Sequence, residues 1–201
     1  MTRFIALVAA AALAAACGGS GHQLERLGED AVVLAFGDSL TYGTGADPSE
    51  SYPAVLERRI GRRVVNAGVP GETSAQGLER LPEVIEEVRP QLLILCHGGN
   101  DFLRRLDESR AADNVRAMIR HAIDRGIPVV LLATPKPGIP PSIPAFYGRI
   151  AEELKLPFQE GVLRSVLFDN RLKSDAVHPN GRGYAEIAEA VADTLERAGA
   201  I

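Results

Sequence analysis

Near the C-terminus, Asp175 and His178 lie three residues apart, and Pro179 follows the histidine directly. One short turn at this spacing can place the carboxylate beside the imidazole. The carboxylate would hold the ring through its Nδ1–H and leave Nε2 free to accept a proton from a serine hydroxyl. Because proline disfavours helical geometry in the residue before it, we expect His178 in a loop ahead of the last helix. The pair predicts an acid–base element for nucleophilic catalysis.

The candidate nucleophile is Ser39, which follows an apolar run in the segment Gly37-Asp38-Ser39-Leu40. Glycine permits a tight turn there, and such a turn would present the serine at the edge of a sheet. Gly-Asp-Ser is also ordinary turn composition, so this segment alone fits a purely structural turn equally well.

A third segment, around Gly71, follows the next apolar run. Gly71 can bring its backbone N–H close to a reacting group just before a helix begins. Taken alone, the segment is more simply an ordinary turn in which Thr73 or Ser74 caps the helix.

A fourth segment, His97-Gly98-Gly99-Asn100-Asp101, follows another apolar run. Its paired glycines leave room for a substrate, and Asn100 can direct a side-chain amide into the same crevice. Here too a plain turn is the simpler interpretation, with Asp101 as a local turn or cap residue.

Short apolar runs alternate with segments of helical periodicity, and together they must position these residues. The runs are typical of strands buried on both faces of a parallel sheet, and they cover residues 31–36, 64–67, 92–96 and 129–133. Between them, side chains such as Tyr52, Leu56 and Ile60 form one apolar helical face. The alternation predicts an α/β fold: a single three-layer α/β/α domain around a central, mostly parallel sheet of about five strands.

The end of the chain predicts a long helix, which Asn180 can cap and which carries the apolar stripe Tyr184, Ile187, Val191 and Leu195. Residues 135–144 contain five prolines and predict a stiff loop beyond a strand end. In open α/β sheets ligands bind outside the carboxyl ends of the strands, so the four polar segments are expected to meet there.

The four segments together resemble the SGNH (GDSL) hydrolases. The matching blocks are, in order, Gly37-Asp38-Ser39-Leu40, Gly71, Gly98-Gly99-Asn100-Asp101 and Asp175-Ala176-Val177-His178-Pro179. The resemblance runs from about Val32 to Leu195, and residues 71–81 look especially like the arylesterase, lysophospholipase and acyl-thioesterase branch. It implies a flavodoxin-like sheet and serine esterase activity.

By position, the resemblance implies that Ser39 is the nucleophile, His178 the general base and Asp175 the residue that orients the base. It also implies an oxyanion hole made by the backbone N–H groups of Ser39 and Gly71 and the side chain of Asn100. No metal and no cofactor are expected. The span between residues 149 and 175 is shorter than in thioesterases of this branch, which leaves the preferred substrate open.

His97 is the alternative base, because it also stands at a predicted strand end, but no carboxylate is spaced in the sequence to orient it. His121 is expected to face solvent or to lie at a helix edge, and His22 to lie in the tether. Cys96 lies within an apolar run, where we expect a small buried side chain without chemistry.

Residues 1–16 look like a secretory signal, because Arg3 precedes an apolar stretch that is too short for a bilayer span of ~20 residues. Leu13-Ala14-Ala15-Ala16-Cys17 resembles the lipobox of bacterial lipoproteins, which implies a lipid on Cys17; simple export is the alternative. Residues 17–30 are expected to be a flexible tether, and residues 31–201 the domain. The resemblance favours the periplasmic face of an outer membrane.

A formal net charge of −4 over 201 residues gives no basic footprint for nucleic acid. A 46% hydrophobic composition is sufficient for one core without disulfides. The expected substrate is a small acyl ester, such as an aryl or short-chain ester or a lysophospholipid. The alternatives are a carbohydrate O-acetylesterase acting on envelope polysaccharide, and a non-catalytic lipoprotein that binds a lipid or partner in the same crevice.

Overall fold

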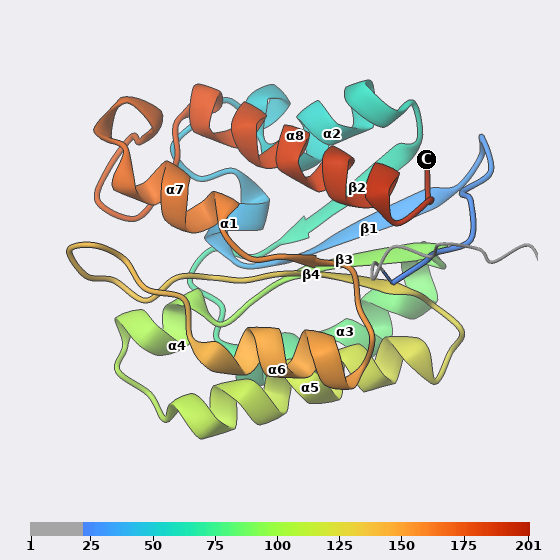
Figure 1. Ribbon diagram of the computed structural model, residues 1–201, viewed down its shortest axis with the longest axis horizontal. Coiled ribbons are helices and arrows are strands. Elements are labelled where there is room, and N and C mark those ends of the chain that lie inside the picture. Colours follow the sequence, from blue (N-terminus) through green and yellow to red (C-terminus); the bar gives the residue numbers. More distant parts are fainter. Residues whose placement is uncertain (1–21) are drawn as a thin grey trace, which may run out of the picture.

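The computed structural model describes residues 22–201; the expected signal segment, Cys17 and the beginning of the expected tether lie outside the described residues. Strands and helices alternate along the chain (Figure 1). The strands are β1 (Val32–Gly37), β2 (Arg63–Gly68), β3 (Leu92–Cys96), β4 (Val129–Leu132) and β5 (Phe158–Gln159). The α-helices are α1 (Ser39–Tyr42), α2 (Tyr52–Ile60), α3 (Ser74–Val88), α4 (Gly99–Leu103), α5 (Glu108–Ile123), α6 (Ala145–Glu153), α7 (Val162–Phe168) and α8 (Gly181–Arg197), and two 3₁₀ turns are η1 (Pro48–Glu50) and η2 (Asn170–Leu172).

The five strands form one parallel sheet in the order β2-β1-β3-β4-β5. This is the flavodoxin-like order, so the predicted fold class is confirmed. Four strands lie within one or two residues of the predicted apolar runs. The fifth, β5, pairs with β4 through only two residues and is too short to produce an apolar run of its own.

Helices cover both faces of the sheet (Figure 1). The side chains of β1 contribute to the hydrophobic core on each face. Val33 and Ala35 belong to the cluster formed with α2, α7 and α8, whereas Leu34 and Phe36 belong to the cluster formed with α3, α5 and α6. Successive strand side chains point to opposite faces, so a continuous apolar run supplies two cores at once. The predicted three-layer arrangement is therefore present.

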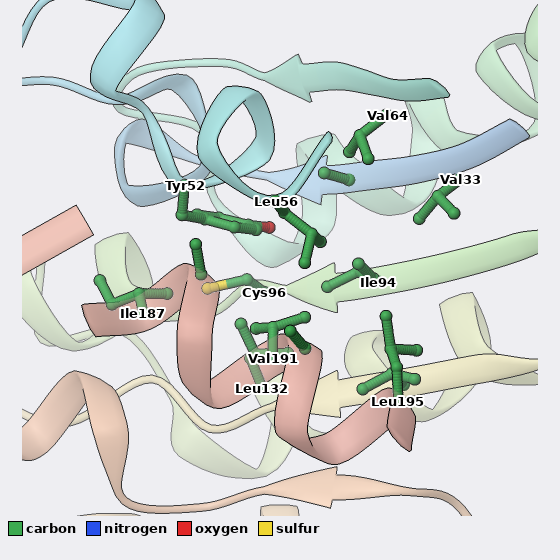
Figure 2. Packing of buried hydrophobic residues seen from close by; sticks show 14 of the residues in the cluster. Val33, Tyr52, Leu56, Val64, Ile94, Cys96, Leu132, Ile187, Val191 and Leu195 are labelled. Atoms are coloured by element: carbon green, nitrogen blue, oxygen red, sulfur yellow. The ribbon is translucent and has the colours of Figure 1, made fainter. Parts of the chain in front are cut away.

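The apolar stripe of α8 packs against the sheet as predicted. Ile187, Val191 and Leu195 face Ile94 and Leu132 of the central strands (Figure 2). The helix begins where expected, because the Asn180 side chain accepts a hydrogen bond from the Gly183 N–H at 3.1 Å.

Cys96 is fully buried in the cluster of Figure 2. Burial raises the pKa of its thiol to about 12. A neutral, enclosed thiol is a poor nucleophile, which agrees with the expectation that Cys96 has no chemical role.

The N-terminal segment packs against the domain before the expected boundary at Ala31. The Leu24 and Leu27 N–H groups donate to the carbonyl oxygens of Ala198 and Ala200 at 2.7 and 2.8 Å. Leu27 is 7% exposed and belongs to the core. The packed part of the chain therefore begins within residues 17–30, which the sequence predicts to be a flexible tether. Within residues 22–201, no helix combines the length and apolarity needed to cross a membrane.

Candidate active site

Ser39 is the first residue of α1, directly beyond the carboxyl end of β1. Asp38 caps this short helix, because its Oδ1 accepts a hydrogen bond from the Leu40 N–H at 3.0 Å. The Asp38 carboxyl is 1% exposed, and burial raises its pKa. The half-buried Ser39 side chain is thus presented at the sheet edge, as the sequence predicts.

His178 lies between Ser39 and Asp175. Its Nε2 is 3.1 Å from the Ser39 Oγ, and its Nδ1 is 2.8 Å from the Asp175 Oδ2. A carboxylate can only accept at Nδ1, so Nδ1 carries the proton and Nε2 accepts from the serine hydroxyl. The three side chains form one hydrogen-bonded chain, although Ser39 is 139 positions from His178 in the sequence.

The loop that carries His178 is held by its own hydrogen bonds. Asp175 Oδ1 accepts from the Val177 and His178 N–H groups at 2.8 and 2.9 Å, and the Ser174 N–H donates to the His178 carbonyl at 3.0 Å. Partial burial favours a higher pKa for the Asp175 carboxyl, but the His178 ring and these N–H groups outweigh it and lower the pKa. Asp175 therefore remains ionised and orients the imidazole.

The backbone N–H groups of Ser39 and Gly71 follow the carboxyl ends of the neighbouring strands β1 and β2. In residues 22–201, neither the Ser39 nor the Gly71 N–H donates to a protein acceptor. Gly71 has φ +79°, a conformation that side chains disfavour, and its carbonyl is turned to accept from the Arg104 guanidinium at 2.6 Å. The carbonyl is thus engaged while the N–H is left unpaired.

The Asn100 side chain, at the start of α4, lines the same site as Ser39. Its Nδ2 donates to the Glu72 carbonyl at 3.0 Å and, more weakly, to the Asp38 Oδ2 at 3.3 Å. An oxyanion would have to take over or share the longer of these two bonds. Asn100 also satisfies two buried acceptors, so its removal affects stability as well as chemistry.

A cleft of about 500 Å³ opens beside Ser39 at the carboxyl edge of the sheet. One wall is the proline-rich loop, in which Lys136 pairs with Ser142. The other is formed by Leu167 and Phe168 at the end of α7 and by Val177 of the histidine loop. The walls are largely apolar, with Lys136, Asn170 and Lys173 as their polar exceptions, and Ser39, Asn100 and His178 also line the cleft.

The amino-acid sequence matches the model of the GDSL-like lipase/acylhydrolase family over residues 35–186, which spans all four segments described above. The chain belongs to this family. It is accordingly a carboxylic ester hydrolase, and the predicted family is confirmed.

Relatives of this GDSL-like hydrolase carry esterase names. It is 33% identical to the esterase TesA of Pseudomonas aeruginosa over 82% of this chain and 87% of that protein. It is 27% identical to thioesterase 1/protease 1/lysophospholipase L1 of Escherichia coli over 82% of this chain and 83% of that one. The crystal structure of AlinE4, an SGNH-hydrolase family esterase, has a TM-score of 0.64 at 33% identity and covers 86% of this chain and 98% of its own.

His97 in this GDSL-like hydrolase is placed differently from the sequence-based expectation. It is fully buried, and a carboxylate does orient it: Glu72 Oε2 lies 3.1 Å from its Nε2. The expectation that no carboxylate serves His97 is therefore wrong, because the partner comes from a different strand end. Nδ1 is also engaged, by the Gly98 N–H at 3.2 Å, so neither ring nitrogen is free to act as a base.

Asp101 caps a distant helix rather than its own turn. Its two carboxylate oxygens accept from the backbone N–H and the hydroxyl of Ser74 at 2.8 and 2.7 Å, at the start of α3. This contact ties the Asn100 segment to the helix that follows Gly71.

The buried Glu72 carboxylate gives a prediction for acid stability. Burial opposes its ionisation, but Arg80 and His97 outweigh burial and lower its pKa from 4.5 to about 2. The unfolded chain therefore binds this proton first as the pH falls, so stability present above about pH 5 is lost toward pH 2. Lowering the pH from about 6 to about 3 should reduce the free energy of unfolding of the wild type by roughly 2 kcal/mol through this carboxyl group. Glu72→Gln should not show this reduction. Urea unfolding at the two pH values measures the difference.

The matched control is Glu153→Gln, which removes an exposed carboxylate paired with Arg116 and Arg120. Exposed ion pairs contribute little, so this variant should keep the pH dependence of the wild type. Equal pH dependence in wild type and Glu72→Gln would contradict the assignment of a depressed pKa to Glu72.

Proposed function

We propose that Ser39, His178 and Asp175 form the catalytic triad of this hydrolase, and that it cleaves small acyl esters through an acyl-enzyme. The observation that supports this is the hydrogen-bonded chain from the Ser39 Oγ through the His178 ring to the Asp175 carboxylate, with links of 3.1 and 2.8 Å. A serine hydroxyl is a weak nucleophile at neutral pH, and such a chain supplies the base that activates it.

In the first half-reaction, the Ser39 Oγ attacks the ester carbonyl carbon while His178 Nε2 takes the hydroxyl proton. Asp175 stabilises the resulting imidazolium and does not itself become protonated. When the tetrahedral intermediate collapses, the bond to the alcohol oxygen breaks and His178 returns the proton to that oxygen. The alcohol leaves and the acyl group stays on Ser39.

The negative charge on the carbonyl oxygen needs donors that are in place beforehand. The Ser39 and Gly71 N–H groups and the Asn100 amide are the proposed donors, and each such donor is typically worth roughly 3–4 kcal/mol of barrier. In the second half-reaction, water attacks the acyl-enzyme, again with His178 as base, and releases the acid and the free Ser39.

The substrate class is proposed from the cleft and from the names of the relatives. The largely apolar walls of the cleft suit an acyl chain or an aryl group. A sugar ring would require many polar partners. Aryl and short-chain esters and lysophospholipids therefore rank ahead of acetylated polysaccharide. The wall formed by the proline-rich loop is the part most suited to an acyl chain.

The expected result is a chain-length preference measured per active site. A fluorophosphonate probe should label one site per chain and give the concentration of active enzyme. On p-nitrophenyl esters, kcat/KM should rise from acetate to butyrate and hexanoate, because each buried methylene contributes about 0.8 kcal/mol of binding.

Two outcomes would contradict the proposal. A rate that is highest on acetate and falls sharply with chain length would favour a carbohydrate O-acetylesterase. Failure of the probe to label the protein would favour a non-catalytic lipoprotein that binds ligands in the same cleft.

We further propose that the protein is exported and carries a lipid on Cys17, with the domain on the periplasmic face of the cell envelope and the outer membrane favoured. This proposal is supported by the segment of residues 13–17, which resembles a lipobox.

A further inference from the structure

Glu72 is a buried carboxylate directly after Gly71, in the loop between β2 and α3, and the triad makes no use of it. It is 6% exposed. Arg80 grips both of its oxygens, with Nε to Oε1 at 2.7 Å and an Nη to Oε2 at 2.6 Å. Such a two-pronged contact fixes the direction of the carboxylate as well as its charge.

Arg80 is itself tied to the sheet. The same guanidinium donates to the Ala67 carbonyl of β2 at 3.1 Å and lies 4.1 Å above the centre of the Phe36 ring of β1. Glu72 is thus anchored through Arg80 to the two strands whose ends carry Ser39 and Gly71.

His97 fixes Glu72 from the other side, on the segment that carries Asn100. Because the His97 Nδ1 accepts from the Gly98 N–H, the ring proton sits on Nε2 and is donated to Glu72. The ring fits against α3 only because residue 77 is glycine: a Cβ there would lie 2.3 Å from Nε2. The space for His97 is built into the helix.

The backbone of Glu72 makes the last connection. Its carbonyl accepts from the Asn100 Nδ2 at 3.0 Å, the shorter of the two bonds that hold this amide. Glu72 therefore follows Gly71 directly in the chain, holds the Asn100 amide with its main-chain carbonyl, and holds the His97 segment with its side chain.

We propose that Glu72, anchored by Arg80 and His97, is a positioning residue that sets the distance between the Gly71 and Asn100 oxyanion donors. The inference rests on the proposed function, because it assumes that Gly71 and Asn100 donate to the oxyanion. It assigns no bond-making step to Glu72. Donors must be held within about 0.5 Å of the productive geometry. Glu72 links the two loops that carry them, together with the contacts of Arg104 with Gly71 and of Asp101 with Ser74.

The test compares Glu72→Gln and Glu72→Ala with wild type, using enzyme concentrations titrated with a fluorophosphonate. Glu72→Gln keeps the size and one acceptor for Arg80, so kcat on p-nitrophenyl butyrate should fall about 10-fold; Glu72→Ala should lose about 100-fold. KM should change less than about 2-fold, because substrate binding in the ground state does not use these donors.

The affinity for an alkylboronic acid distinguishes a positioning role from a merely structural one, because loss of stability alone would not change it. The boronic acid forms a tetrahedral anion on Ser39, which needs the same donors as the intermediate, so its affinity should fall by the same factor as kcat in each variant. A variant that is only less well folded would instead lower the titrated fraction and keep kcat per site and boronate affinity at wild-type values, which would overturn the inference.

Arg80→Met provides a second variant should Glu72→Ala not fold, since the Arg80 side chain is 24% exposed and methionine retains most of its stem. It should lower kcat about 10-fold, and the double variant with Glu72→Gln should lose less than the product of the two single losses. Glu153→Gln is the control and should keep wild-type kcat. If wild type is not labelled by the probe, the proposed function fails; if it is labelled and both Glu72→Gln and Arg80→Met retain full kcat per site, only this inference fails.

Discussion

Ser39→Ala is expected to lower kcat/KM for p-nitrophenyl butyrate by at least about 10⁴-fold, because no other group can carry the acyl chain once the nucleophile is removed. The fold should persist, since the Ser39 Oγ has one side-chain partner, His178. The midpoint of urea unfolding should therefore stay close to that of the wild type. Fluorophosphonate labelling should disappear together with the activity.

Ser165→Ala is the matched control, because Ser165 is an exposed residue of α7 outside the cleft. It should keep both labelling and rate. Turnover by Ser39→Ala within about 10-fold of wild type would reject Ser39 as the nucleophile.

His178→Ala should have an effect of similar size, about 10⁴-fold or more on kcat/KM, because it removes the ring nitrogen that lies 3.1 Å from the Ser39 Oγ and accepts its proton. Residues that act as a unit are not additive, so the double variant with Ser39→Ala should be no slower than either single variant. Steady-state kinetics of the three variants measures this.

Variants of His97 and His121 separate a general base from a positioning group. His97→Gln should lose far less than His178→Ala, because His97 acts only through Glu72. His121→Ala, on the outer part of α5, should keep full activity. A His178→Ala variant more active than His97→Gln would reverse the assignment of the base.

The sequence predicts most of this fold because β1, β3 and β4 are continuous, buried apolar runs. The expectation of a strand buried on both faces is wrong for β2, which lies at the sheet edge, contains the exposed Asn66 and has only Val64 buried. It also predicts the proposed triad, since Asp175 and His178 are local in the chain and Ser39 stands directly after a run. The strand β5 is missed because two residues carry no pattern.

The contact between Glu72 and His97 could not be predicted in the same way. The two residues are 25 positions apart, and they meet only because β2 and β3 lie on either side of β1 in register. The close packing of the His97 ring against Gly77 likewise depends on how α3 lies over the sheet. The Asn100 amide meets Asp38 and Glu72 because the ends of β1, β2 and β3 lie side by side. Residue types reveal which groups can react, whereas strand order decides which of them stand together.

Both chain ends of the described domain leave it at the amino edge of the sheet. A hollow there is lined by residues 23–28, by the residues just before β1, β3 and β4, and by Ala200, whereas the cleft beside Ser39 lies at the opposite edge. The attachment points of the domain and its substrate cleft therefore lie at opposite edges of the sheet. Immobilising the domain through residue 22 or residue 201, on a bead, a fusion partner or a bilayer, would direct the cleft away from the support.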